Sequence, residues 1–174
     1  MQDARDHAMH SEVFSVSVRE VRRIVAALKK GKSLAVVGTT SSRTLESLYW
    51  IGVKKLRGHA VDQTNLTLEQ FEWIPLQVGE PVDRIAALES LLDERNDDDA
   101  LTGSTSLMII PETYEFRMVD HLMTNFHAPD STLMLLVSAF LDITKIRSVY
   151  GEAAKRGFKF LSYGDACLFS KPTK

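Results

Sequence analysis

Two apolar strand patterns in this chain each end in a cluster of polar residues that leads into a helical pattern. The first is "SLAVVG" at 33–38, which four hydroxyl residues and an arginine follow. The second is "RMVDHLMTNF" at 117–126, followed by "HAPDST" and then by the apolar run "LMLLVSAFL". Continuous apolar strands that alternate with helices are typical of α/β proteins, because parallel strands are buried on both faces. We therefore expect an α/β fold, a layered α/β/α sandwich around a mainly parallel or mixed sheet.

Hydrophobic periodicity predicts the remaining elements. Strands are expected at 12–18, 71–76 (an edge strand that contains Pro75), 104–111 and 117–126, with two strand pieces around a Gly-Asp turn in 158–169. Helices are expected at 18–30 (capped by Ser17), 41–51, 81–92, from about 131, and 144–156. An acidic, solvated loop is expected between the third helix and the strand at 104–111.

Length and composition describe an ordinary soluble protein. With 174 residues, 44% of them hydrophobic and 25% charged, the chain suits one domain of residues 1–174. The single cysteine excludes an internal disulfide framework. No signal peptide is recognisable and the longest apolar run is too short for a bilayer, so we expect a cytoplasmic location without membrane contact. Residues 1–60 hold eleven Lys/Arg against five Asp/Glu, which gives weak support for a polyanionic partner.

The hydroxyl cluster after the first strand predicts an anion site. Thr39, Thr40 and Ser41 lie where a helix begins, and Arg43 offers a guanidinium suited to a carboxylate or phosphate. Ligands of open α/β sheets bind beyond the carboxyl ends of the strands, which is where this cluster lies. Helix capping by one of these residues is the alternative, although it explains one hydroxyl better than four.

The polar cluster after the second strand has two interpretations. Asp130 or Ser131 can cap the following helix, but capping leaves Thr124, Asn125 and His127 without a role. Histidine is the side chain best suited to proton transfer near neutral pH, so His127 is a catalytic candidate. A histidine satisfied structurally within the core is the alternative of equal weight.

The "SYGDA" stretch at 162–166 is the third candidate. A turn explains Gly164 and Asp165, while Ser162 and Tyr163 would line the same cleft if this strand lies beside the second one. Metal binding is a minor alternative, for which the sequence offers three sets of side chains. These sets are His7, His10 and Glu12 in "HAMHSE"; Asp120, His121 and His127; and His121, His127 and Asp165, the last of which would make a metal hydrolase.

Four stretches together resemble one family, the S-adenosylmethionine:tRNA ribosyltransferase-isomerases of queuosine biosynthesis. They are "HAMHSE", "AVVGTTSSRTLES", "VDHLMTNFHAPDSTLMLLVSAF" and "FLSYGDACLF", which occur in the family's order. Together they span nearly the whole chain except about 60–103, which is expected to be an insertion.

The resemblance implies a transferase that moves the ribosyl part of S-adenosylmethionine onto an aminomethyl-deazaguanine at the tRNA wobble position. The ribose rearranges to give epoxyqueuosine, and adenine and methionine leave. S-adenosylmethionine is then a substrate, tRNA is the partner, and no metal or tightly bound cofactor is implied. His127 and Asn125 would move protons or hold the leaving adenine. The implied substrate-binding residues are Thr39, Thr40, Ser41, Arg43, Thr124, Ser131, Thr132, Tyr163 and Asp165.

The chain also departs from the family. Family members are about twice as long, and the family's N-terminal half and inserted β-barrel domain are absent, so the chain is expected to be a C-terminal portion that is inactive alone. Asp130 stands where the family usually has a basic residue, Ser42 where it has an aliphatic one, and "PETYEF" where it has Pro-Gly-Tyr. These departures motivate an alternative function, a non-catalytic ligand- or RNA-binding module of the same fold. The oligomeric state is not predicted.

Overall fold

The computed structural model describes residues 9–171, which fall into two compact units. Unit 1 contains the described residues up to Ser33 together with Arg43–Leu107. Unit 2 contains Leu34–Ser42 and the described residues from Met108 onward. The single domain expected from chain length stays a prediction.

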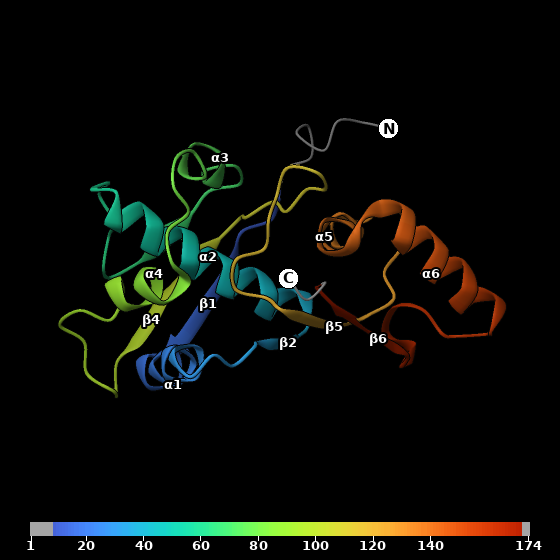
Figure 1. Cartoon of the computed structure of the whole chain (residues 1–174), viewed down its shortest axis with the longest axis horizontal. Helices are drawn as coiled ribbons and strands as arrows, with labels where there is room; N and C mark the ends of the chain where they lie inside the picture. Colours follow the sequence, from blue (N-terminus) through green and yellow to red (C-terminus); the bar gives the residue numbers. More distant parts are fainter. Residues whose placement is uncertain (1–8, 172–174) are drawn as a thin grey trace. The chain divides into compact units, whose positions relative to one another are not determined.

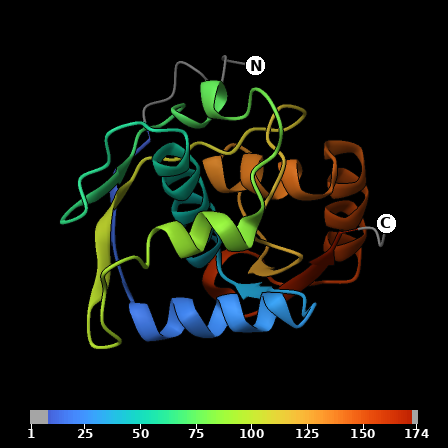
Figure 2. The same ribbon diagram turned by 60° about the vertical axis from the view of Figure 1, so that its left-hand side comes forward.

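Unit 1 is built on a mixed three-stranded sheet with the order β1-β4-β3. The strand β1 (Glu12–Ser17) pairs antiparallel with β4 (Ala100–Thr105), which pairs parallel with β3 (Leu66–Leu68). Figure 2 shows the blue β1 beside the yellow-green β4. Gly103 in β4 has to be a glycine, since a Cβ there would lie 1.8 Å from the carbonyl oxygen of Leu66.

Four helices accompany this sheet in the chain: α1 (Val18–Lys29), α2 (Thr39–Leu56), α3 (Trp73–Leu76) and α4 (Arg84–Ser90). The predicted cap of α1 is confirmed, because Ser17 Oγ accepts a hydrogen bond of 3.2 Å from the Glu20 amide. The fully buried core of unit 1 includes Val18, Leu48, Ile51, Leu66, Leu68, Trp73, Leu88 and Leu101. Several of these residues lie in 60–103, so the predicted insertion contributes to the core of unit 1.

Unit 2 is built on a second mixed three-stranded sheet with the order β2-β5-β6. Here β2 (Ala35–Val37) pairs parallel with β5 (His121–Asn125), and β5 pairs antiparallel with β6 (Ala166–Ser170). The described part of this unit also contains the first turn of α2 and the helices α5 (Thr132–Leu141) and α6 (Ile143–Lys155), which Figure 1 labels, together with the short 3-10 helix η2 (Leu161–Tyr163).

The core of unit 2 lies on one face of its sheet. Val36, Leu122 and Phe169 form a buried row across the three strands. Aromatic rings extend this core, since Phe126 packs against Tyr150 and Phe160 with ring centroids 5.2 and 5.0 Å apart. The helix α5 adds the buried residues Leu136, Val137 and Phe140.

The mixed α/β class expected from the sequence is confirmed, although the strands form two sheets. The strand at 33–38 is shorter than predicted, and its three residues are buried on one face only. The predicted edge strand at 71–76 is wrong, because this segment forms α3. The strand predicted at 104–111 lies instead at Ala100–Thr105, and η2 replaces the first strand piece of 158–169.

The second predicted helix continues through Gly52 to Leu56. Gly52 lies inside α2 and allows a close approach of the backbone of α4, since a Cβ there would lie 2.1 Å from the carbonyl oxygen of Ala87. Gly52 therefore allows two helices to pack closely, whereas the sequence pattern predicted that the helix ends just before this residue.

Candidate functional site

The ends of two parallel strands meet at one edge of the unit 2 sheet. Because β2 and β5 are parallel, their carboxyl ends lie at the same edge. The amide of Gly38, the residue after β2, donates a hydrogen bond of 2.8 Å to the carbonyl of Met123 in β5. Gly38 has a φ of +90°, a conformation that favours glycine, and α2 begins at the next residue. The first two predicted motifs are therefore neighbours.

The hydroxyl residues form the first turn of α2. Thr40 and Ser41 are exposed, Thr39 is half-buried and Ser42 is completely buried. The amide groups in the first turn of a helix attract anions, although the Ser42 amide here donates to the Gly38 carbonyl over 3.2 Å. The positions of Thr39, Thr40 and Ser41 suit the predicted anion site, whose ligand stays a prediction.

Arg43 is occupied by an ion pair. Its guanidinium Nη1 lies 3.0 Å from Oε1 of Glu12, and only 3% of the Arg43 side chain is exposed. Burial lowers the pKa of Arg43, and the negative charge of Glu12 partly opposes this shift. A guanidinium that is buried and neutralised in this way is poorly placed to contact a substrate. Direct substrate binding by Arg43 stays a prediction.

His127 is held on the buried side of unit 2. Its Nε2 lies 2.8 Å from Oγ1 of Thr124, and its backbone amide donates to the hydroxyl of Tyr150 over 3.2 Å. Burial lowers the pKa of His127, so the imidazole is neutral at pH 7. Among the described residues, none forms a hydrogen bond with Nδ1 of His127. A role of His127 in proton transfer stays a prediction.

The third motif lies beside the second. The Asn125 Nδ2 donates to the backbone carbonyl of Asp165 over 3.1 Å, and the Asp165 carboxylate accepts from the amide of Lys159. The amide of Leu161 donates to the carbonyl of Phe126 over 2.7 Å. The residues "SYGDA" therefore adjoin the carboxyl end of β5. This meets the condition set in the sequence analysis, that the strand of this segment lies beside the strand of the second motif. Tyr163 in this segment is exposed.

Ser131 is used as a helix cap. Its hydroxyl accepts a hydrogen bond of 3.2 Å from the Met134 amide and donates one of 2.8 Å to the Ala128 carbonyl. Thr132, the first residue of α5, is half-buried, and Asp130 is exposed before it. The capping interpretation thus accounts for Ser131, and its contact with substrate stays a prediction.

Sequence reasoning missed three partners of these residues. Tyr150 lies in the helix predicted at 144–156, and its hydroxyl accepts a hydrogen bond from the backbone amide of His127. The Cys167 thiol donates to the Thr124 carbonyl over 3.2 Å, and burial raises the pKa of this thiol to about 11. Glu12 belongs to the quoted "HAMHSE" stretch, but its partner Arg43 lies 31 residues away in the chain. No local pattern connects residues at that separation.

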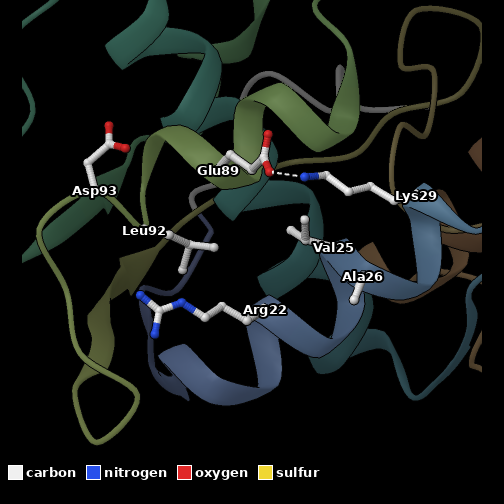
Figure 3. Close-up of a pocket in the computed structure, with 7 residues that line it drawn as sticks. All are labelled: Arg22, Val25, Ala26, Lys29, Glu89, Leu92 and Asp93. Atoms are coloured by element: carbon white, nitrogen blue, oxygen red, sulfur yellow. Dashed lines mark ion pairs between the residues drawn. The ribbon is translucent and has the colours of Figure 1, made fainter.

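The rest of the described chain offers no competing site among the predicted residues. A groove on α1 and α4 is lined by Arg22, Lys29 and Glu89 among others, and none of the predicted site residues lines it (Figure 3). In the described part of the chain, no three His, Cys, Asp or Glu side chains gather to hold a metal ion. His7 of the first predicted metal set lies outside that part. None of the helices within residues 9–171 has the length and apolar character needed to cross a membrane.

The fold and the strand-end cluster define a mixed α/β protein whose polar motifs gather where two parallel strands end. A family described as queuosine biosynthesis protein matches residues 1–169. The chain belongs to this family.

Known proteins named for one enzyme activity match nearly the whole length of the chain. An S-adenosylmethionine:tRNA ribosyltransferase-isomerase of Nitratidesulfovibrio vulgaris is 36% identical over 166 residues, which cover 95% of this chain and 33% of that protein. Another from Nitrosospira multiformis is 34% identical over 171 residues, or 98% of this chain and 39% of that protein. The crystal structure of an S-adenosylmethionine tRNA ribosyltransferase from Thermotoga maritima matches with a TM-score of 0.57 and 29% identity, covering 90% of this chain and 40% of that one. The chain thus spans about a third of the curated relatives it matches.

Proposed function

We propose that this chain is the α/β portion of an S-adenosylmethionine:tRNA ribosyltransferase-isomerase. The complete enzyme would transfer the ribosyl moiety of S-adenosylmethionine to the aminomethyl-deazaguanine wobble base of tRNA and rearrange it to epoxyqueuosine. Adenine and methionine would leave. One observation carries the proposal: three motifs that are far apart in the sequence gather at the shared carboxyl end of β2 and β5. The names of the relatives supply the reaction class.

His127 is the residue we assign to proton transfer. A neutral imidazole can accept a proton, and the lowered pKa of His127 keeps it neutral at the pH of the cell. Thr124 holds Nε2 and Tyr150 holds the backbone, so Nδ1 is the proposed base in the tautomer in which Nε2 donates its hydrogen to Thr124 Oγ1. General-base catalysis of this kind contributes about 10²–10⁴-fold in rate.

Asn125 is assigned to the leaving adenine. Its amide nitrogen already donates to the Asp165 carbonyl, so its side-chain oxygen remains to accept a hydrogen bond. The exocyclic amino group of adenine is a donor that suits such an oxygen. Tyr163 and Asp165 would form the adjoining wall.

The first turn of α2 is assigned to an anionic group of the substrates. Thr39, Thr40 and Ser41 present hydroxyls beside a helix N-terminus, which suits the methionine carboxylate or an RNA phosphate. Arg43 would support this turn through its pair with Glu12. Thr132 would approach the same group from α5, as the sequence predicts.

The chain alone is proposed to be inactive, because it spans about a third of its relatives. The rest of the family architecture would complete the site and the tRNA contacts. A tRNA substrate also suits a cytoplasmic location.

The decisive assay is adenine release from S-adenosylmethionine in the presence of precursor tRNA. The samples are the complete product of the gene, its His127→Ala variant, this chain alone, and a His59→Ala control at an exposed position in unit 1. Release by the complete product and by the control, with loss in His127→Ala, would support the assignment. If the complete product binds a competent tRNA and releases no adenine, the transferase assignment fails.

A second candidate function is a non-catalytic module that binds RNA or a small ligand. Two observations favour it: Asp130 puts an exposed acid before α5, and Glu12 neutralises Arg43, so the positive charge available for chemistry is reduced. This candidate predicts that the complete product binds tRNA or S-adenosylmethionine in a titration and yet leaves the adenine glycosidic bond intact.

A further inference from the structure

One face of the unit 2 sheet is apolar and exposed. The register places Val37, Met123 and Leu168 in one row across the three strands, and their side chains are 65%, 43% and 65% exposed. The adjacent row of Val36, Leu122 and Phe169 points the other way and is buried. We call the row of Val37, Met123 and Leu168 the open row.

The strands that carry the open row hold no side chain of the four strongly charged types. The strands β2, β5 and β6 contain no Lys, Arg, Asp or Glu. A sheet face that meets water normally alternates its buried residues with polar ones, and contiguous exposed apolar surface marks a site of interaction. On the same face, the polar side chains of His121 and Ser170 bond to each other, with 2.8 Å between Nδ1 and Oγ. The composition of this face is that of an interface.

We propose that the open row is the docking surface for the polypeptide that the relatives carry outside the region they share with this chain. The relatives provide the occupant, since the matching region covers only 33% to 39% of each of the two described above. A contiguous exposed apolar surface on the shared part is the kind of surface on which such a segment can be held in a fixed position. The proposal rests on family membership and stands independently of the proposed reaction.

Docking on this face also reaches the candidate site. Asn125 is two residues beyond Met123 in β5, so both side chains emerge on the same face. A polypeptide seated on the open row would extend beside Asn125 and form a wall that this chain does not supply.

Cysteine labelling tests the proposal. The variant Leu168→Cys is made in a Cys167→Ser background, both in this chain alone and in this chain joined to the non-matching part of the Nitratidesulfovibrio vulgaris relative. The control is Val78→Cys in the same background, at an exposed position of unit 1. In the joined protein we expect maleimide labelling at position 168 to slow by about tenfold or more, while labelling at position 78 changes by less than about twofold. Equal labelling at 168 in a joined protein that melts cooperatively overturns the proposal.

A second measurement decides the question if the joined protein does not fold. The double variant Met123→Lys, Leu168→Lys of the isolated chain should keep the wild-type melting temperature and bind less of an apolar fluorescent dye. The control Leu122→Lys places the same charge on the buried face and should unfold the chain. A loss of stability in the double variant equal to that of the control means that the row is packed within the chain, which overturns the proposal. So does light scattering that shows a dimer of the isolated chain which the double variant dissociates, because the occupant would then be a second copy.

Discussion

Replacing Glu12 by alanine is expected to destabilise unit 1 more than replacing Arg43 by methionine, although Glu12 is the more exposed partner. The two side chains form one ion pair of 3.0 Å, but they differ in access to water: 3% of the Arg43 side chain is exposed and 37% of the Glu12 side chain. Removing one partner leaves the other charge without its counter-charge. The cost therefore depends on which charge remains.

The remaining environment sets the magnitude. In Glu12→Ala the guanidinium keeps its buried position without a counter-charge, which costs about 3–5 kcal/mol for a buried pair that loses one member. Arg43 Nε already lacks a hydrogen-bond partner within the described residues, so the guanidinium has little local compensation. In Arg43→Met the remaining carboxylate has a buried Oε2 without a hydrogen-bond partner among residues 9–171, but it belongs to a side chain that is 37% exposed, so it can rotate toward water. The methionine keeps most of the buried volume. The expected cost is then about 1 kcal/mol, the scale of an exposed pair.

Urea unfolding monitored by tryptophan fluorescence measures both costs. Trp50 and Trp73 are the two tryptophans of the chain, and both lie in unit 1 with the ion pair. Their fluorescence emission therefore follows the unfolding of unit 1. The control is Glu20→Ala, which removes an exposed pair with Arg23 and should change the free energy of unfolding by less than about 0.5 kcal/mol. Equal costs for Glu12→Ala and Arg43→Met, or a cost of Glu12→Ala that matches the control, would refute the reasoning.

Three further outcomes follow from the structure. Burial lowers the pKa of His127 in the folded chain below its ordinary value of 6.5, so the unfolded chain binds more protons. The stability that His127 contributes is therefore complete above about pH 6.5 and is lost as the pH falls through 6.5 toward the folded pKa. In urea titrations at several pH values, a His127→Gln variant should lose this dependence of stability on pH. Gly52→Ala should cost about 1–3 kcal/mol in thermal unfolding because the new Cβ meets the backbone of Ala87, whereas Gly151→Ala in α6, with open space around it, should gain about 0.5–1 kcal/mol. With a pKa of about 11, the Cys167 thiol should resist iodoacetamide at pH 8 in the folded chain and react readily in urea, as mass spectrometry would show.

Local patterns predicted the elements that local energetics decide. The cap at Ser17 and the apolar stripes of α1 and α6 involve residues within a few positions of each other, so the sequence suffices. The strand β4 was misplaced because its pattern is weak: Gly103 sits in its middle, where contact with Leu66 of a distant strand requires a glycine. The segment 71–76 reads as a strand by composition, yet it forms α3, in which Trp73 is buried in the core.

The candidate site divides in the same way. The sequence placed each of two polar clusters at the carboxyl end of a strand, and the parallel pairing of β2 with β5 brings these two strand ends to one edge of the sheet. It did not predict how Arg43 and Ser131 are used. Arg43 is neutralised by Glu12, which no local rule pairs with it, and Ser131 spends its hydroxyl on a cap that competes with any ligand.

The alternation of β5 explains how a site can use both His127 and Asn125. Thr124 and Asn125 are consecutive, so their side chains point to opposite faces of the sheet. Thr124 faces the buried side and positions His127, while Asn125 faces the open row. A substrate that contacts both residues has to lie across the end of the strand, next to the first turn of α2, where the Gly38 amide holds β2 to β5. A polypeptide docked on the open row would then enclose this position from one side, while His127 keeps its place on the other.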